Sequence, residues 1–502
     1  MGSKRHSLRL KQLGINTYKE SVVYMHAGCH ICHAEGFEAP ARIEVTLNER
    51  KILATLHSIE TNILQADEAG LSTYAWEVLN AKEGDKIYLA HPKPLDSFSY
   101  VLSKIYGHDL QKEELTQIIQ DIVAGYLSDL QIAVFLTACA SGHLNKSETL
   151  YLTKAMISAG DTVQWSSEII VDKHCVGGLP GNRTTLIVVP IVAAFGLTIP
   201  NTSSRAITSP AGTADTMEVL APVSLDISAM RQVVEQENAC LVWGGAVTLS
   251  PADDILVRIE HVLDLDSEGQ LVASILSKKR AAGVTHLLVD IPIGLTAKVR
   301  TQSMAMLLKN YLESIGKELG MHVHTIFTDG TQPIGRGIGP ALEARDIIAV
   351  LQGDLNAPQD LRERSLILAG QILEFSPDVK LGTGKQLATQ LLDSGRAWQK
   401  FQAISKAQGG MFKLPTAAYT HIVTATRSGK VVAIDSRKLA RVAKLAGAPV
   451  SKAAGVEWLA PLGTMITKDQ PLFVIYSETH GELKYARSYL EQEHDIIKLE
   501  EK

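Results

Sequence analysis

The segment Val171–Thr185 constrains the fold of this chain more than any other stretch of its 502 residues. It reads VDKHCVGGLPGNRTT, follows the apolar residues Ile169 and Ile170, and opens a helical stretch near Thr184. Its glycines let backbone N–H groups approach an anion closely, while hydroxyls and the helix N-terminus favour negative charge. We call it the phosphate segment, because it predicts a strand, an anion-binding loop and a helix. The alternative interpretation is a plain strand–helix turn with charged surface residues.

A second segment, Thr202–Thr213, has six hydroxyl residues in twelve positions and is called the hydroxyl segment below. It follows the short apolar run Leu197–Ile199 and precedes a helix expected from about Asp215. Serine-rich segments are often flexible linkers. Here apolar stretches with helical periodicity flank it on both sides, which favours a pocket wall. In a parallel sheet both segments lie at the carboxyl ends of strands, where ligands bind.

The pattern of apolar residues predicts an α/β fold combined with α+β parts. Apolar runs typical of buried parallel strands alternate with helical stretches over residues 166–410, which predicts a central α/β domain with a mostly parallel sheet. Residues 96–165 show helical periodicity and predict a helical layer. We expect a small β-rich domain over residues 1–95 and an α+β domain over residues 411–502.

Composition narrows the classes of protein further. The net charge of −5 gives no sign of bulk nucleic-acid binding. The first residues lack the apolar run of a secretory signal, and no stretch reaches the roughly 18–20 apolar residues of a membrane span, so we expect a cytoplasmic protein. Five cysteines in a chain of this length argue against a disulfide framework and for free thiols.

Together the two segments resemble signature sequences of the thymidine phosphorylase family of pentosyltransferases. Lys173–Gly178 is similar to that family's Lys-His-Ser-x-Gly-Gly phosphate loop. Ser203–Glu218 is similar to its Ser-Gly-Arg to Gly-Gly-Thr-x-Asp-x-x-Glu signature, and Ser274–Lys279 to its Ser-x-x-x-Lys helix. The resemblance covers about residues 95–502. The N-terminal β domain and the variant Gly-Leu-Pro-Gly-Asn-Arg-Thr-Thr resemble a subgroup that contains archaeal AMP phosphorylases and bacterial proteins labelled as thymidine phosphorylases.

The resemblance implies a set of binding residues. The phosphate site would comprise Lys173, the backbone of Cys175, Gly178, Thr185, Ser203 and Thr213. The substrate pocket would be lined by Ser204, Arg205, Ala206, Ile207, Thr208 and Ser209. Ser274 and Lys278 would face the nucleobase, and Lys298 would be a further substrate contact.

The chemistry of phosphorolysis fits these residues. A held phosphate attacks C1′ of the sugar, so binding makes the reaction effectively intramolecular. The leaving base gathers negative charge, which a neutral acid or a cation should meet. Asp266 falls where the subgroup has its proton donor, and burial would raise its pKa as this role requires. His174 is the reserve acid, and an ordinary turn is the alternative interpretation of Asp266.

Three departures from the family pattern leave the substrate open. Cys175 replaces a serine, so one hydroxyl ligand of phosphate is lost. Asn182 and Arg183 replace an acidic position, and an arginine there could clamp a 5′-phosphate bidentately. Ile259 stands where the pyrimidine enzymes have a base-contacting arginine, although Arg258 is adjacent. The predicted reaction is therefore phosphorolysis of thymidine to thymine and 2-deoxyribose 1-phosphate. The alternative is phosphorolysis of AMP or another nucleoside monophosphate to a base and ribose 1,5-bisphosphate.

Two further classes of protein stay open. A Mg²⁺-dependent phosphoribosyltransferase would need an acidic pair near the pocket, for which Asp253-Asp254 is the candidate. A non-enzymatic metal or nucleotide sensor is suggested by Cys175 and by a cluster of possible zinc ligands, His26, Cys29, His30, Cys32 and His33. That cluster lacks a second Cys/His pair, so a β-turn is the favoured interpretation. We expect no metal and no cofactor, inorganic phosphate as a substrate, and a homodimer or larger homo-oligomer paired through the helical layer.

Overall fold

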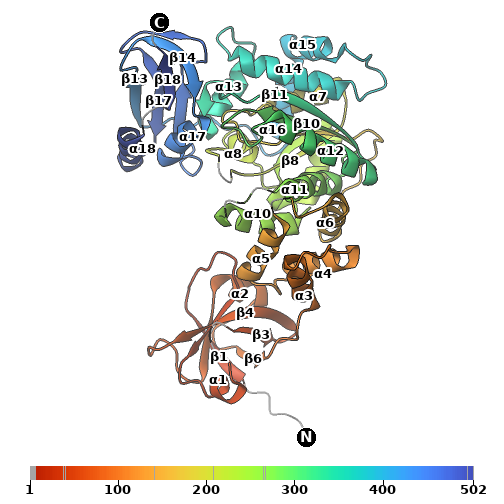
Figure 1. Cartoon of the computed structure of the whole chain (residues 1–502), viewed down its shortest axis with the longest axis vertical. Helices are drawn as coiled ribbons and strands as arrows, with labels where there is room; N and C mark the ends of the chain where they lie inside the picture. The colour runs from red at the N-terminus through yellow and green to blue at the C-terminus, as the bar shows by residue number, and fades with distance from the viewer. Residues whose placement is uncertain are drawn as a thin grey trace. The chain divides into compact units, whose positions relative to one another are not determined.

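The computed structural model describes residues 7–37, 39, 41–140, 142–206, 209–263, 265, 267–493 and 496–500. The chain forms two compact units. One unit comprises Met1–Ala155 with Ala252–Ser267, and the other comprises Met156–Pro251 with Glu268–Lys502 (Figure 1). Cys139, Cys175 and Cys240 carry free thiols, as expected. Within the described residues, no helix is long and apolar enough to cross a bilayer.

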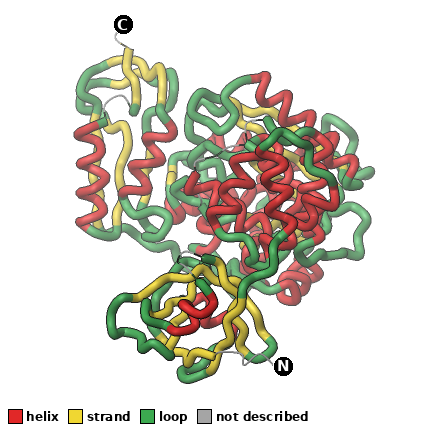
Figure 2. The backbone as a smooth tube through the Cα atoms, turned by 60° about the horizontal axis from the view of Figure 1, so that its bottom comes forward, coloured by secondary structure: helices red, strands yellow, loops and turns green. Residues whose placement is uncertain are grey.

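The first unit begins with a closed β-barrel, seen as a ring of strands near the N-terminus in Figure 2. The strand order is β1-β5-β2-β4-β3-β6. Alternation predicts this arrangement, because the apolar side chains of β3 fill the barrel while its polar ones face outward. The elements are β1 (Ser7–Gln12), β2 (Val22–His26), α1 (His30–Glu35), β3 (Arg42–Leu47), β4 (Arg50–Ile59), β5 (Glu68–Leu71), α2 (Thr73–Leu79) and β6 (Lys86–Ala90).

A helical layer follows the barrel, as the periodicity predicts. It comprises α3 (Asp96–Ile105), α4 (Lys112–Val123), α5 (Asp129–Cys139) and α6 (Lys146–Ser158). Ser128 and Gln131 form a capping box that begins α5. Helix α10 (Pro251–Leu263) also groups almost entirely with this unit, and its Arg258 forms an ion pair with Asp129 of α5 at 2.6 Å. This helix lies within the range 166–410 predicted for the central domain, so the compact units differ from that prediction here, and the other domain boundaries stay predictions.

The second unit contains two sets of parallel strands, in agreement with the mostly parallel sheet expected. One set has the order β11-β10-β7, with β7 (Val171–Cys175), β10 (His286–Ile293) and β11 (His322–Asp329). The other pairs β8 (Ile199–Ser203) with β9 (Ala239–Trp243). A parallel bridge between Ile170 and Thr198 connects the chain segments that lead into β7 and β8. The loops of the phosphate segment and of the hydroxyl segment therefore leave the sheet at the carboxyl ends of adjacent strands.

Helices surround these strands, and Figure 1 shows α12 and α14 beside β10 and β11. Helix α7 is apolar along nearly its whole length and lies in the core of the unit. The helices are α7 (Thr185–Phe195), α8 (Thr213–Glu218), α9 (Ile227–Glu237), α11 (Glu268–Ala281), α12 (Gln302–Glu318), α13 (Pro340–Leu351), α14 (Gln359–Leu373), α15 (Gly384–Asp393) and α16 (Arg396–Ala407), with a 3₁₀ turn at Gly244–Ala246.

The C-terminal part is α+β, as the sequence predicts, and its strands form two small sheets. Their orders are β12-β15-β17-β13 and β16-β14-β18. Strand β12 (Gly337–Ile338) comes from the central part of the chain, so backbone pairing with β15 joins the two parts. The other elements are β13 (Tyr419–Thr424), β14 (Gly429–Ile434), α17 (Ser436–Leu445), β15 (Gly455–Trp458), β16 (Met465–Ile466), β17 (Pro471–Ser477), α18 (His480–Gln492) and β18 (Ile497–Glu500).

Candidate active site

Lys173 lies at the centre of the phosphate segment. Its ammonium group donates to the hydroxyls of Thr184 at 2.5 Å and Thr185 at 3.3 Å, where α7 begins. Only 2% of Lys173 is exposed, and burial lowers the pKa of its ammonium group, with Asp290 opposing that shift. A cation and two hydroxyls thus meet at a helix N-terminus, which is the chemistry that binds a phosphate oxyanion. Thr185 is one of the predicted phosphate ligands, whereas Thr184 was predicted only as the start of the helix.

The glycines of the phosphate segment allow a close approach of two chain segments. Gly177 and Gly178 have φ values of +97° and +82°, in the left-handed region that favours glycine. A Cβ atom at Gly178 would lie 2.3 Å from the backbone nitrogen of Lys298, whereas a Cβ at Gly177 would meet open space. Gly178 therefore brings Lys298, another residue implied by the family resemblance, alongside the phosphate segment.

A buried polar network lies behind the phosphate segment. The amide nitrogen of Asn182 is 3.2 Å from the thiol of Cys175 and 3.4 Å from the carboxylate of Asp290. Thr328 donates a hydrogen bond of 2.6 Å to the same carboxylate. Burial and the nearby Asp290 carboxylate together raise the pKa of Cys175 to about 12, so its thiol is protonated at neutral pH. Cys175 is therefore a polar packing group here and not a thiolate nucleophile.

Arg183 forms an internal ion pair. Its Nε atom lies 2.7 Å from a carboxylate oxygen of Glu343, on α13. Other guanidinium nitrogens donate to the backbone oxygens of Asn182 and Ala211. Glu343 also accepts a hydrogen bond from Thr216 at 2.7 Å. Arg183 thus ties the phosphate segment to α8 and α13, and its charge is already compensated inside the protein.

The hydroxyl segment is held in shape by acidic residues of α8. Both terminal nitrogens of Arg205 bind Glu218, at 2.8 and 2.6 Å, and the guanidinium group lies 4.7 Å from the ring centre of Trp243. These bonds hold the pKa of Glu218 at about 2. Asp215 accepts the backbone N–H groups of Ala206 and Gly212 at 2.6 and 2.9 Å. The segment is therefore a fixed wall and not a flexible linker over its described residues.

Two hydroxyls of the hydroxyl segment donate hydrogen bonds to backbone carbonyl oxygens. Ser203 ends β8 and donates to the oxygen of Val242 at 3.3 Å, and Ser209 donates to the oxygen of Ala211 at 2.8 Å. Thr213 begins α8, two residues before the expected helix start. Ile207 and Thr208 lie outside the described residues, as does the proposed proton donor Asp266.

His174 lies among lysines. Burial lowers its pKa well below the usual value, and Lys279, Lys278, Lys173 and Lys298 lower it further. Lys279 is used structurally, because it pairs with Asp172 at 2.6 Å and donates to the Thr202 oxygen at 2.8 Å. His174 is therefore a neutral imidazole at neutral pH and a poor source of a proton, although its ring N–H can still donate a hydrogen bond.

Two family models match this chain. The helical bundle domain of a glycosyl transferase family matches residues 99–160, and the a/b domain of that family matches residues 167–398. A "Putative thymidine phosphorylase" of Legionella pneumophila (strain Paris) is 63% identical, with 99% of this chain and 96% of the relative aligned. Proteins with the same name from Polaromonas sp. and Hahella chejuensis are 54% and 52% identical, over 98% of this chain and 96% and 98% of the relatives.

The chain belongs to the thymidine/pyrimidine-nucleoside phosphorylase family. It is accordingly a glycosyltransferase that moves a pentosyl group. The fold is also found in anthranilate phosphoribosyltransferases of Thermus thermophilus and Saccharomyces cerevisiae, each with a TM-score of 0.52. These structures are 18% and 16% identical, and the alignments cover 62% and 63% of this chain and 99% and 98% of theirs.

The base-side residues implied by this phosphorylase family are partly brought together. Ser274 and Lys278 lie one turn apart on α11, and the ammonium group is 3.1 Å from the serine hydroxyl. The charges of Lys278 and Lys298 both lower the pKa of His174, so both lysines lie near this histidine. Arg258, adjacent to the position of the family's base-contacting arginine, instead pairs with Asp129. Ile259 is buried.

The structural role of the acidic residues that hold the candidate site was not predicted from the sequence. They are Asp172, Asp290 and Glu343, all buried, and Glu218. A charged residue inside an apolar strand is the signal that could have found Asp172 and Asp290, because buried charges need partners. Glu343 lies on a helix whose sequence gives no such signal, whereas Glu218 is the last residue of the family signature quoted above, although its pairing with Arg205 was not predicted.

The Cys/His cluster of the N-terminal domain does not form a metal site in the described residues. His26 accepts the backbone N–H of Gly28 at 2.9 Å, and Cys29 is buried. The side chain of Cys32 lies outside the described part of the chain. Across the described residues, no three His, Cys, Asp or Glu side chains come together in a way that could hold a metal ion.

Proposed function

We propose that this pentosyltransferase phosphorolyses thymidine to thymine and 2-deoxyribose 1-phosphate. The observation that carries the proposal is the cation–hydroxyl group formed by Lys173, Thr184 and Thr185 at the start of α7. Inorganic phosphate needs a cation and hydrogen-bond donors, and this group offers both without a metal ion. The family and the names of the relatives support the nucleoside as the second substrate.

In this mechanism a phosphate oxygen forms a bond to C1′ while the bond between C1′ and the base nitrogen breaks. Fixing phosphate against the sugar converts a bimolecular step into an effectively intramolecular one. The base leaves with the electron pair and takes up a proton, for which Asp266 is the proposed donor. Ser274, Lys278 and Lys298 are proposed to meet the base and the substrate. Neutral His174 is proposed to donate a hydrogen bond rather than a proton.

The ion pair between Arg183 and Glu343 supports a nucleoside over a nucleotide. A 5′-phosphate clamp needs an arginine whose fork of donors faces the ligand. Arg183 is already engaged inside the protein, because its Nε faces Glu343 in an ion pair and each terminal nitrogen donates to a backbone oxygen, and only 11% of its side chain is exposed. Binding a 5′-phosphate through Arg183 would leave Glu343 buried without its cation, which costs several kcal/mol.

The alternative is phosphorolysis of AMP or another nucleoside monophosphate to ribose 1,5-bisphosphate. One observation favours it. Lys173, Lys278 and Lys298 all raise the positive potential at His174, and such a field suits a ligand with a second phosphate.

The test is the phosphate-dependent release of base from thymidine, uridine, AMP, CMP and UMP by the full-length enzyme. Release from thymidine with none from the nucleotides is the expected result. Release from nucleotides alone would refute the thymidine proposal and support the alternative. Glu343→Gln is a useful second variant, because freeing Arg183 should let AMP act as a weak competitive inhibitor of thymidine turnover.

Two further measurements address the phosphoribosyltransferase alternative and the oligomeric state. We expect full activity in the presence of a chelator, because the proposed mechanism uses no metal or other cofactor. Loss of activity with EDTA and its recovery with Mg²⁺ would favour a phosphoribosyltransferase-like reaction. Light scattering tests the proposed homodimer, and a monomer at working concentration would contradict it.

A further inference from the structure

The turn that carries Lys298 is short and tightly packed. It follows β10, and within it Ala297 donates to the oxygen of Gly294 at 3.0 Å while Gly294 donates to the oxygen of Val299 at 3.1 Å. The turn packs against Gly178 on one side, as described above. A Cβ atom at Gly294 would lie 2.1 Å from the oxygen of Gly330. A small displacement of this turn would therefore move Lys298 relative to the phosphate segment.

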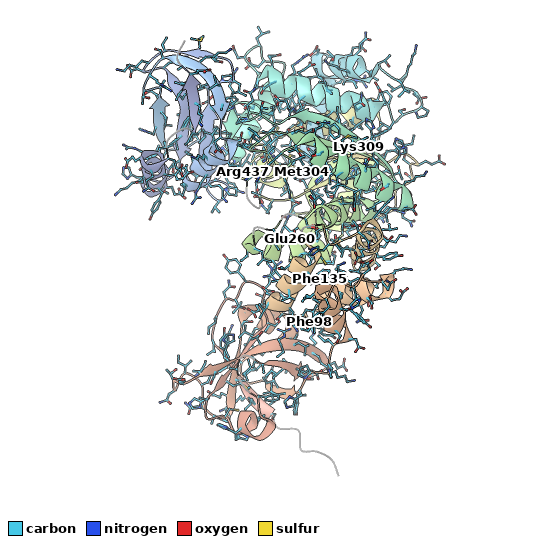
Figure 3. The ribbon with its side chains drawn as sticks, viewed as in Figure 1. Phe98, Phe135, Glu260, Met304, Lys309 and Arg437 are labelled. Carbon is cyan, nitrogen blue, oxygen red and sulfur yellow. The ribbon has the colours of Figure 1, made fainter. Side chains whose placement is uncertain are left out.

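A residue of the C-terminal domain binds this turn. Arg437 donates from Nε to the oxygen of Thr296 at 3.2 Å and from Nη2 to the oxygen of Ala297 at 3.4 Å. These are the two carbonyl groups immediately before Lys298. Figure 3 labels Arg437 at the edge of the C-terminal domain nearest the central elements. Asp435 fixes the start of α17 by accepting the backbone N–H groups of Arg437 and Lys438 at 3.0 Å each.

We propose that Arg437 is a positioning residue for Lys298, so that the C-terminal domain takes part in substrate binding. The inference rests on the proposed function, in which Lys298 contacts the substrate. A guanidinium group that bridges two successive carbonyls fixes the direction in which the next residue leaves the turn. Misplacing a binding group by about 1 Å can cost up to about 100-fold in rate. Loss of the bridge should therefore weaken substrate binding although Arg437 touches no substrate.

Attachment of the C-terminal domain does not depend on Arg437. Strand β12 pairs with β15, and the Trp458 indole donates to the oxygen of Gly335 at 2.6 Å. Lys452 pairs with Glu218 at 2.7 Å. Removing Arg437 should consequently leave the domain in place and release only the turn.

The experiment compares Arg437→Ala with Arg441→Ala in the full-length enzyme. Arg441 lies one helical turn further along α17, is exposed, and stacks on Tyr489 at 5.4 Å, so its removal makes the same charge change away from the turn. Hydrogen–deuterium exchange is followed over residues 294–300, and KM and kcat are measured for the nucleoside and for phosphate. In Arg437→Ala we expect about tenfold faster exchange in the turn and a tenfold rise in nucleoside KM. We expect kcat within about threefold of wild type and Arg441→Ala unchanged.

A double variant separates positioning from general destabilisation. If Arg437 acts through Lys298, Arg437→Ala combined with Lys298→Ala should bind nucleoside no worse than Lys298→Ala alone. Arg437→Lys, which keeps the charge and one donor nitrogen, should have a nucleoside KM between those of wild type and Arg437→Ala. Additive effects, or exchange in the turn equal to wild type, would overturn the proposal. Absence of phosphorolysis by the wild-type enzyme would refute the proposed function, while the exchange measurement would still decide whether Arg437 holds the turn.

Discussion

Buried charges in the central domain occur in partnered arrangements that fix backbone segments. Lys279 and Asp172 are both fully enclosed and lie 2.6 Å apart, and Arg183 and Glu343 are similarly close. Such pairs add little net stability, but removal of one partner leaves an uncompensated charge that costs about 3–5 kcal/mol. Their effect in this protein is to hold the ends of β7, β8 and α8 in a single arrangement.

His174 predicts a dependence of stability on pH. Its folded-state pKa is lowered, so the unfolded chain binds the proton first, and stability falls as pH drops below about 6.5. Between pH 7 and pH 5.5 the titration of His174 should lower the free energy of unfolding by about 1 kcal/mol. His174→Asn should therefore lose less stability over that interval than wild type, measured by thermal unfolding at both pH values. The exposed His108→Asn serves as the control, and equal acid sensitivity of wild type and His174→Asn would contradict the argument.

Cys175 predicts a slow and strongly pH-dependent alkylation. With a pKa of about 12, its thiolate fraction at pH 8 is on the order of 10⁻⁴. Labelling by iodoacetamide, followed by mass spectrometry of the peptide, should rise about tenfold per pH unit from pH 8 to pH 10. A plateau near pH 9 would show an ordinary thiol. Cys175→Ser should keep activity within about threefold, because the thiol is not a nucleophile in the proposed reaction.

At the scale of elements, the site is a strand–loop–helix unit whose loop packs against a second turn. The two neighbouring glycines of the loop give a matched test of this packing. Gly177→Ala and Gly178→Ala both strain a positive φ, by about 1–3 kcal/mol. Only the second also places a methyl group against the backbone of Lys298. We expect kcat/KM to fall about 100-fold in Gly178→Ala and less than tenfold in Gly177→Ala, and equal losses would show that the close approach is unimportant.

The order of the elements could be predicted from sequence because it depends on local patterns. Alternation in Arg42–Leu47 and helical periodicity over Ser436–Leu445 match strand β3 and helix α17 in the structure. The phosphate segment could be placed at a strand end for the same reason. The partners of its charges could not be predicted, because they come from distant parts of the chain. Arg183 meets Glu343 160 positions later, and nothing local distinguishes that glutamate from a surface residue.

At the scale of the whole molecule, contacts between distant segments decide which parts act together. The C-terminal domain reaches the hydroxyl segment through Lys452 and Glu218, and the turn of Lys298 through Arg437. The C-terminal domain is therefore connected to the hydroxyl segment and to the turn that carries Lys298. Helix α10 shows the same principle in the first unit, since it lies between central elements in sequence but groups with the helical layer.

The pairing of Arg258 with Asp129 leads us to predict that Arg258 holds α10 in place and does not contact the nucleobase. Its guanidinium group binds Asp129 in a bidentate pair at 2.6 and 2.8 Å, joining α10 to α5. Because both side chains are partly exposed, the coupling between them should be about 1 kcal/mol, measured by a double-mutant cycle of Arg258→Ala and Asp129→Ala in thermal unfolding. The ratio of kcat/KM for thymidine to that for uridine should stay within about twofold in Arg258→Ala. A larger change in that ratio would show that Arg258 reads the base, as the arginine of the pyrimidine enzymes does, and that its pairing with Asp129 is exchanged for substrate during turnover.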